Sequence, residues 1–568
     1  MKHGAKRMFC LGILMLLMVF PAEGLSGKEL ILTFECPVAP GQTQVLSRKV
    51  KTDYQVFLPG CWDLTKIRIT FDGANSVSFD NRSFGSGETA DLSGMLGRKM
   101  KLTRNGKGRL GNIIIYQGSA VANVHLTLDE KSLKKAMKDK HVIIPDGHAL
   151  VTEADGTVDY EGNLTQFKGR GNNTFSNKYA KKPFQFKLSA KADLCGMGKG
   201  KTWLLIANYL DISLMRNQIN LDLAREMGMR GSVECVQADV WLNGVYHGLY
   251  LLTEKIQINK NRVPIRNLEE ETEMLNEQPS DSYQKFTEKD KDTGTEIRGY
   301  EIPNDPEDIT GGYILELDKP YRYDKGGTSG FRTSVGLHFV VKEPTSVSRA
   351  QVTYISGLFD RFWRAVQDNS GYDPITGAYY SDFIDMDSFA MKYLIEDFCK
   401  NFDVLAGSQF FFKDSDAVDG KIYAGPCWDY DLCMGNIHIQ GIGSGLYPKG
   451  SWLSRVKNGR INWYAMLYKH PDFQEAVQRI YFERFRPALS VLIGETSAEG
   501  RTIRSLEQYE SAISDSAEMN FIRFRAGSVQ GIYEKSGKNH EDAKKYLFRW
   551  IRQRVVSMDE EYGYPAGL

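Results

Sequence analysis

Two aspartates separated by one aromatic residue are the strongest chemical signal in this sequence. Asp429 and Asp431 lie in segment 425–436 beside Trp428 and Tyr430. Carboxylates are unfavourable in apolar surroundings unless a positive charge binds them. In an extended strand both side chains would point to one face, which suits a hard divalent cation such as Mg²⁺. We interpret the pair as a metal site; a paired structural knot at a strand end is the alternative.

A second acid stands just after a predicted helix. Asp403 follows the helix expected over 385–400, and Ser408 comes five residues later. A loop acid on a rigid scaffold remains accessible and is a good position for a general base. A helix-capping role for Asp403 explains the same position equally well.

A glycine-containing loop precedes a lysine-bearing strand. Arg170, Gly171 and Asn172 begin the loop, and the following strand carries Lys187. The backbone N–H groups of such a loop can face an anion, and the strand directs the lysine to one face. A polyphosphate site is one interpretation, and a tight turn with solvated lysines is the other.

One predicted helix lies between strands in this region. Met215, Ile219, Leu223 and Met227 recur every four residues, with Ser213 as the expected cap and a glycine at the end. Asp222 and Glu226 share a helix face, so either acid could orient a lysine from a neighbouring strand. A solvated helical face is the simpler interpretation of both acids.

The elements that must position these residues change character along the chain. Short strands separated by Gly, Asn and Asp clusters predict a β-sandwich-like module over 25–128. A connector over 129–144 and a β-rich lobe over 145–265 follow, the latter with a hairpin turning at Asn243-Gly244. Residues 266–310 are polar and poor in aliphatic residues, which predicts a mobile insertion.

From residue 311 to the C-terminus, helical periodicity dominates. It predicts helices over 348–368, 385–400, 471–494, 502–525 and 541–560, with a short hairpin over 409–426. The predicted fold class is therefore α+β, with a sandwich-like module, a β-rich N-lobe and a helical C-lobe over 311–568.

Composition excludes several classes of protein. The chain has 568 residues with 42% hydrophobic and 25% charged residues, which is typical of globular proteins. Its 72 Lys and Arg against 71 Asp and Glu offer no general attraction for nucleic acid. Cysteines outside the first 24 residues are odd in number and scattered, which is no disulfide framework; a Cys36–Cys61 pair and two solitary buried thiols are equally compatible with the sequence.

The N-terminal segment predicts export. A basic start, a short apolar run over 8–20 and small residues at Ala22 and Gly24 are typical of a cleaved signal peptide over 1–24. The apolar run is too short to span a bilayer, so we expect no stable membrane span after cleavage. The expected location is secreted, periplasmic or cell-surface.

Seven strings in order resemble the CotH kinase family, the spore-coat protein H type of atypical kinases. They are Arg170-Gly171-Asn172, Lys182-Pro183-Phe184-Gln185-Phe186-Lys187, Trp203-Leu204-Leu205-Ile206-Ala207-Asn208-Tyr209, Leu214-Met215-Arg216-Asn217, segment 242–256, Gly311-Gly312-Tyr313-Ile314-Leu315-Glu316-Leu317-Asp318 and Trp428-Asp429-Tyr430-Asp431. The resemblance covers roughly residues 160–440. It implies an atypical two-lobed kinase fold that uses ATP and Mg²⁺ to phosphorylate Ser or Thr of a protein substrate.

The resemblance also implies roles for individual residues. Lys187 would contact phosphates, the loop from Arg170 through Gly171 and Asn172 would cover the nucleotide, and Glu254 would lie in the hinge beside adenine. Asp403 would orient or deprotonate the acceptor hydroxyl. The metal ligands would be Asp429, with Asp431 as a possible second ligand and Ser408 where the family usually has Asn.

Because Ser408 stands where the family usually has Asn, two other functions are also compatible with the sequence. The first alternative is a weak or inactive kinase-like binding protein of the cell surface or envelope, because a serine hydroxyl ligates Mg²⁺ less well. The second is a carbohydrate-active enzyme that uses the paired carboxylates, although two acids on one strand would flank a substrate poorly.

Overall fold

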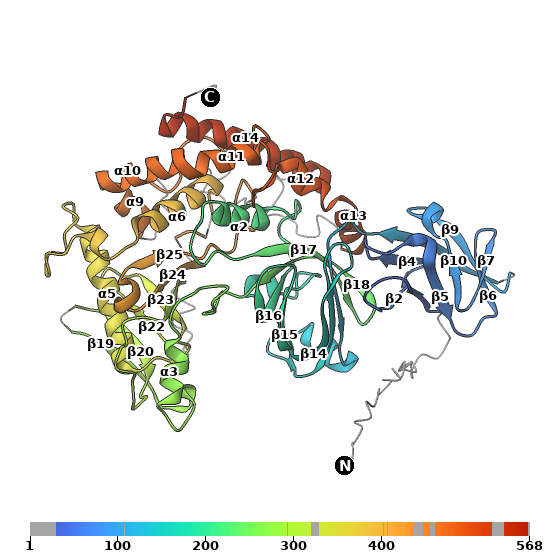
Figure 1. Cartoon of the computed structure of the whole chain (residues 1–568), viewed down its shortest axis with the longest axis horizontal. Coiled ribbons are helices and arrows are strands. Elements are labelled where there is room, and N and C mark those ends of the chain that lie inside the picture. Colours follow the sequence, from blue (N-terminus) through green and yellow to red (C-terminus); the bar gives the residue numbers. More distant parts are fainter. Residues whose placement is uncertain are drawn as a thin grey trace, which may run out of the picture.

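The protein is an α+β protein built around three β structures (Figure 1). The computed structural model describes residues 30–106, 108–291, 293–319, 329–401, 403–405, 407–436, 447–454, 461–524 and 539–565. The expected signal segment, 1–24, lies outside these residues. Within them, no helix is both long enough and apolar enough to cross a membrane.

The N-terminal part is a sandwich of two sheets that enclose their own apolar core. One sheet contains, in spatial order, β2 (Val45–Leu46), β1 (Leu32–Glu35), β5 (Ile67–Phe71) and β8 (Glu88–Ala90). The other contains β3 (Arg48–Val50), β4 (Asp53–Leu58), β10 (Gly108–Gln117), β9 (Met100–Arg104), β6 (Ser76–Phe79) and β7 (Arg82–Gly85). Alternating buried and exposed residues in β5 show why these strands form a sheet with one wet face.

The middle part is a closed barrel (Figure 1). Its sheet runs β12 (Ile143–Ile144), β14 (Val158–Gly169), β13 (Gly147–Thr152), β11 (Ala122–Thr127), β17 (Cys235–Leu242), β18 (Val245–Glu254), β16 (Lys199–Ile206) and β15 (Phe184–Asp193). Pairing of β14 with β15 closes it, so these two long strands have no free edge. Helices α1 (Glu130–Ala136) and α2 (Arg216–Glu226) interrupt the strand order.

Two features of the barrel bear on the sequence predictions. The β17–β18 hairpin turns at Asn243 and Gly244, both with positive φ, which confirms the predicted two-residue turn. The boundary differs, because β11 and β12 fall in the ranges assigned to the sandwich module and the connector yet pair within the barrel. β11 pairs in parallel with β17, which follows more than a hundred residues later, and local patterns carry no signal for such a pairing.

A third sheet lies on the other side of the barrel from the sandwich (Figure 1). Its order is β19 (Lys285–Lys289), β20 (Glu296–Tyr300), β22 (Gly330–Arg332), β23 (His338–Glu343), β21 (Tyr313–Leu317), β24 (Gln409–Lys413) and β25 (Ile422–Ala424). With α3 (Leu268–Met274), strands β19 and β20 come from the segment predicted to be a mobile insertion. The C-terminal part is therefore not purely helical, and the polar composition of 266–310 reflects a sheet edge exposed to solvent.

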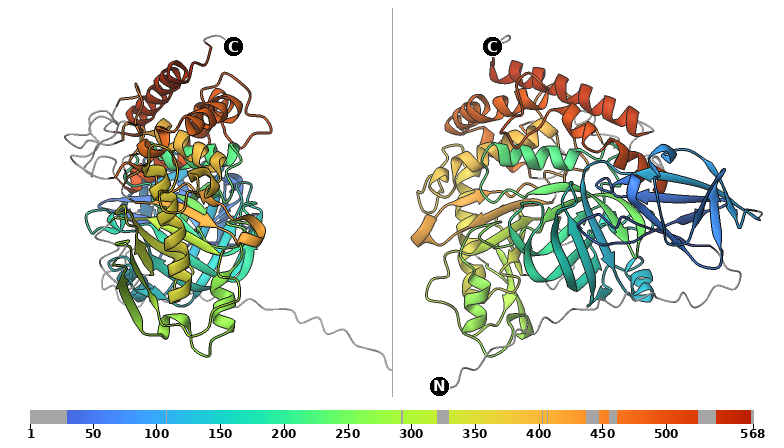
Figure 2. Two further views of the ribbon diagram at one scale, coloured as in Figure 1. Left: turned by 90° about the vertical axis from the view of Figure 1, so that its left-hand side faces the viewer. Right: turned by 45° about the vertical axis from the view of Figure 1, so that its right-hand side comes forward.

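Helices pack on this sheet and form a layer above the barrel, which both views of Figure 2 show. They are α5 (Arg349–Gln367), α6 (Met386–Cys399), α7 (Asp416–Asp419), α9 (Trp463–Tyr468), α10 (Pro471–Ile480), a π-helical turn (Tyr481–Phe485), α11 (Arg486–Leu492), α12 (Leu506–Ser511), α13 (Ser514–Arg523) and α14 (His540–Tyr562). The five predicted helices correspond to α5, α6, α10 with α11, α12 with α13, and α14. Ser348 and Gln351 form a capping box at the start of α5.

Helix α13 joins the sandwich and the barrel at one buried junction. The Ser516 hydroxyl donates to Asp239 Oδ2 at 2.6 Å and accepts the backbone N–H of Ser119 at 2.8 Å. The Tyr246 hydroxyl donates to the other carboxylate oxygen of Asp239 at 2.6 Å. Burial raises the pKa of Asp239 to about 6 despite these donors. A segment close to the C-terminus thus completes the hydrogen bonding of a barrel strand.

Candidate active site

The two aspartates of the strongest sequence signal lie in a loop and not in a strand. Strand β25 ends at Ala424, and Asp429 has a φ of 71°, the left-handed conformation. Asp429 is exposed, whereas Asp431 is buried at 6% exposure. The expected extended geometry is therefore wrong, although the loop still places both carboxylates in one site.

The electrostatics of the loop favour a bound cation. Burial, followed by the charge of Asp429, raises the pKa of Asp431 to about 7. Burial and, to a smaller extent, the charge of Asp403 raise the pKa of Asp429. The Ser408 hydroxyl donates a hydrogen bond of 3.1 Å to Asp429, which opposes this rise. Solvent reaches Asp429, yet protein atoms surround it closely enough to weaken its hydration. Repulsion among these carboxylates would be relieved by a positive charge between them.

Helix α2 holds this loop in place. The Asn217 amide donates to the Asp431 carboxylate and to Asn208 Oδ1, and its oxygen accepts the backbone N–H of Tyr430 at 2.8 Å. The neighbouring Arg216 is fully buried and donates to the carbonyl oxygen of Cys433 at 3.1 Å. Charged and amide side chains are stable in a protein interior only when hydrogen-bond partners such as these satisfy them.

Arg216 is in turn fixed by Asp211. This buried carboxylate pairs with the guanidinium and accepts the backbone N–H of Arg216 at 2.9 Å. Asp211 therefore satisfies the start of α2, and the predicted cap Ser213 instead donates its hydroxyl to Asp211 at 2.6 Å. The positioning roles of Arg216 and Asn217 were missed from the sequence. Helix α2 is rich in polar residues, several of them buried, so these two carried no distinct local signal.

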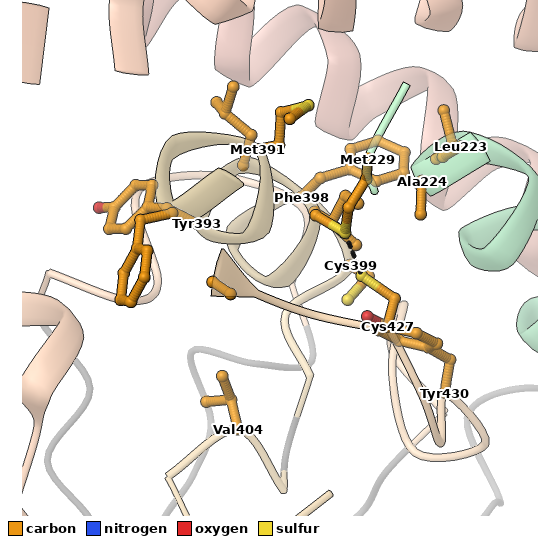
Figure 3. Close-up of a cluster of buried hydrophobic side chains, with 14 of the residues drawn as sticks. Leu223, Ala224, Met229, Met391, Tyr393, Phe398, Cys399, Val404, Cys427 and Tyr430 are labelled. Atoms are coloured by element: carbon orange, nitrogen blue, oxygen red, sulfur yellow. Dashed lines mark hydrogen bonds between the residues drawn. The ribbon is translucent and has the colours of Figure 1, made fainter. Parts of the chain in front are cut away.

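An apolar cluster forms the floor beneath the loop (Figure 3). Figure 3 shows Cys427 in contact with Met229, and the Cys427 thiol lies 3.6 Å from the methionine sulfur. Phe398 and Cys399 at the end of α6 belong to the same cluster. The ends of α6 and of the aspartate loop are thus anchored on a shared core, which fixes their spacing.

Arg170 contributes a positive charge that acts on both aspartates of the pair. Burial lowers its pKa, and the charges of Asp429, Asp431 and Glu316 oppose that fall, so the guanidinium lies among these three carboxylates. It also stands over the Trp428 ring, 5.4 Å from the ring centroid. Glu316 has its own cation, because Lys342 lies 3.1 Å from its carboxylate.

The loop that follows Arg170 has a defined turn. Gly171 has a φ of 84°, and a Cβ there would lie 2.4 Å from the Thr174 hydroxyl oxygen, so only glycine fits without a shift. Asn172 is exposed, and Lys140 donates to its side-chain oxygen at 3.1 Å and to the Gly171 carbonyl oxygen at 2.8 Å. The loop is thus bound to the barrel at its base.

Asp403 lies close enough to Asp429 for its charge to raise the pKa of that carboxylate. Helix α6 ends at Cys399, with Lys400 in the left-handed conformation as its cap, and the chain then turns into the loop of Asp403 and Ser408. The Asp403 carboxylate pairs with Lys319, with 3.0 Å between Oδ1 and Nζ. Asp403 therefore does not cap the helix by a side-chain bond that the described residues show. Lys319 was missed from the sequence.

Lys187 and Glu254 lie elsewhere. Lys187 is exposed on the outer face of β15, whereas its neighbours Phe186 and Leu188 fill the barrel. None of its hydrogen bonds or ion pairs within the described residues reaches the carboxylates of the site. Glu254, at the end of β18, is buried and pairs with Arg262 at 3.2 Å. Its pKa is raised to about 7, chiefly by burial.

The two acids of α2 face a different segment of the chain. Asp222 accepts the Tyr509 hydroxyl at 2.7 Å, and Glu226 pairs with Arg501 and accepts the N–H of Thr502 at 2.8 Å. Both acids dock the connection into α12, and neither bonds to Lys187 in the described part of the chain. Their structural contacts account for their positions on the helix.

The donor set fits a magnesium ion that completes its shell with other ligands. The described residues contain no group of three or more His, Cys, Asp or Glu arranged to hold a metal alone. Mg²⁺ usually takes one or two carboxylates and keeps water and substrate phosphates as its remaining ligands. Asp429 and Asp431, with the Ser408 hydroxyl beside them, supply oxygen donors of that kind.

Comparison with models of known protein families shows which family this chain belongs to. The family described as CotH kinase protein matches residues 165–558, which is most of the chain and includes every residue of the site. The chain belongs to the CotH kinase family. Comparison with curated proteins returns no match. The CotH match confirms the resemblance and supports a kinase-like protein, and it begins at β14, after the sandwich has ended.

Proposed function

We propose that this CotH-family protein is an exported atypical kinase that transfers the γ-phosphate of ATP to Ser or Thr of a protein substrate with Mg²⁺. One observation carries the proposal: three separate segments, which follow β14, α6 and β25, bring Arg170, Asp403 and the pair Asp429 and Asp431 within electrostatic reach of one another. The proposal includes a two-lobed kinase-like arrangement, with the barrel and α2 as one lobe and the third sheet with its helices as the other.

In this proposal some residues neutralise charge on the phosphates and another accepts a proton. Phosphoryl transfer depends mainly on positioning and on neutralising charge at the transferred group. Bound Mg²⁺ would supply most of that neutralisation, held by Asp429 and Asp431. Arg170 would bind phosphate oxygens, and Asp403 would accept the proton of the Ser or Thr hydroxyl.

Loss of the two aspartates tests the proposal directly. The purified chain is incubated with Mg²⁺ and γ-labelled ATP, alone and with generic protein substrates. Asp403→Ala and Asp429→Ala should abolish label transfer, and the matched control Asp281→Ala, at an exposed residue away from the site, should retain it. Transfer at the wild-type rate by both site variants would contradict the assignment.

A catalytically weak binding protein is the second candidate, and Ser408 favours it. Its hydroxyl donates to Asp429 Oδ2 at 3.1 Å and so competes with Mg²⁺ for one oxygen of that carboxylate. Calorimetry with ATP and Mg²⁺ separates the two functions. Micromolar binding that requires Asp429 supports the kinase, and Ser408→Asn should then increase turnover; absence of binding supports an inert scaffold.

A further inference from the structure

Lys319 is the cation that directly contacts the proposed base. It follows β21 by two residues and pairs with Asp403, 84 positions further along the chain. The two side chains are 14% and 21% exposed, so the pair is largely withdrawn from water. Ion pairs in such surroundings are screened much less than surface pairs.

The ammonium group retains capacity for a ligand. A lysine has three N–H donors, and Asp403 is the one acceptor that the described residues provide for Lys319. A largely desolvated donor without an acceptor is unfavourable, and among the residues that the structure describes the two remaining N–H groups find none, so they are available to solvent or a ligand. This separates Lys319 from Lys342, whose exposed ammonium pairs with Glu316.

The lysine lies along the loop that links the base to the metal site. A Cβ at Gly407 would lie 3.8 Å from Lys319 Cε and 3.2 Å from Asp318 Oδ1. The next residue, Ser408, donates to Asp429. Lys319 therefore lies against Gly407, between Asp403 and the serine that bonds to Asp429.

The two cations of the site lie beside different carboxylates. Arg170 lies beside Asp429 and Asp431, while Lys319 lies beside Asp403. A phosphoryl group that reaches a hydroxyl held by Asp403 would meet the repulsion of nearby carboxylates. A cation fixed at Asp403 offsets that repulsion where Arg170 is not in contact.

We propose that Lys319 binds the terminal phosphoryl group of ATP and holds Asp403 in position for the acceptor hydroxyl. The inference rests on the proposed function, because it assumes that a nucleoside triphosphate enters this site. It predicts a contact that a triphosphate makes and a diphosphate does not.

The test compares binding of two nucleotides. Affinities for ADP and for the non-hydrolysable imido analogue of ATP are measured by calorimetry with Mg²⁺ on the wild type, Lys319→Met, Lys319→Arg and Lys134→Met. Lys134 is a matched control, since it forms an exposed ion pair with Glu130 far from the site. Lys319→Met should weaken binding of the ATP analogue tenfold or more and change ADP binding less than twofold.

The other variants and the wild type make each outcome decisive. Lys319→Arg should restore most of the affinity and turnover, because it keeps the charge, and Lys134→Met should match the wild type. Equal effects on both nucleotides, or none, in a Lys319→Met protein with wild-type circular dichroism would overturn the inference. A wild type that binds neither nucleotide would instead refute the proposed function. If Lys319→Met fails to fold, the neutral and polar variant Lys319→Gln takes its place: a larger affinity loss for the ATP analogue than for ADP supports the contact, and equal losses or none refute it.

Discussion

Removal of the Asn217 side chain should uncouple the aspartate loop from helix α2. The Asn217→Ala variant loses the donor to Asp431 and the acceptor for the Tyr430 N–H, both in a buried setting. Each buried group left without a partner costs about 1–3 kcal/mol, so the two groups together should lower the free energy of unfolding by about 2–6 kcal/mol.

Ligand binding should suffer for a separate reason. The amide hydrogen bond favours the ionised form of Asp431, whose pKa burial already raises to about 7. Hydrogen bonds to charged groups contribute about 1.5–3 kcal/mol, which corresponds to roughly a 10- to 150-fold weaker affinity for Mg²⁺ and ATP. The free energy of unfolding is measured by denaturant titration and the affinity by calorimetry.

A neighbouring amide provides the control. Gln218 is buried on the same helix, but its side chain accepts a hydrogen bond from Gln237 of the barrel at 3.1 Å and does not contact the aspartate loop. Gln218→Ala should lose stability and keep its nucleotide affinity. The reasoning is refuted if Asn217→Ala binds as tightly as the wild type, or if both variants lose affinity equally.

Three further predictions concern stability and charge. Burial raises the pKa of Asp222 from 3.8 to about 7, so the folded state keeps a proton that the unfolded state has lost; the free energy of unfolding should fall as pH rises through this window. Asp222→Asn should remove that fall, up to about 4 kcal/mol, in denaturant titrations from pH 4 to 8, and a slope equal to that of the wild type would contradict it. Ser516→Ala should lower the free energy of unfolding by about 2–4 kcal/mol, because Asp239 loses a buried donor, and an unchanged midpoint in urea would count against the junction. Arg170→Met should weaken ATP affinity more than Lys187→Met in parallel calorimetry, since only Arg170 lies beside the carboxylates; the opposite order would restore Lys187 as the main phosphate contact.

Patterns among residues close in sequence were sufficient to predict several helices and one hairpin of this fold. Helical periodicity located α5 and α6 within one or two residues, and Asn243-Gly244 marked the hairpin because that turn needs positive φ at both positions. Residue type and spacing singled out the aspartate loop and Asp403 as candidates, and the resemblance to the CotH family supplied their expected roles. These signals depend on residues that are close in sequence.

The contacts that the sequence did not predict depend on pairing between strands that are far apart in the chain. β21 pairs with β24 almost a hundred residues away, and this pairing brings Lys319 to Asp403. Alternation predicts that a strand has two faces but not which distant strand lies beside it. The left-handed conformation of Asp429 also depends on contacts with α2, which no local pattern encodes.

The junction at Ser516 has a consequence for how the chain is made. Asp239 is fully buried and receives a hydrogen bond from Ser516, 277 positions later. During synthesis the strands of the barrel emerge long before α13, so this carboxylate faces water until almost the whole chain is available. A chain that ends before α13 would therefore form every strand of the barrel but would leave the Asp239 carboxylate without the hydroxyl of Ser516.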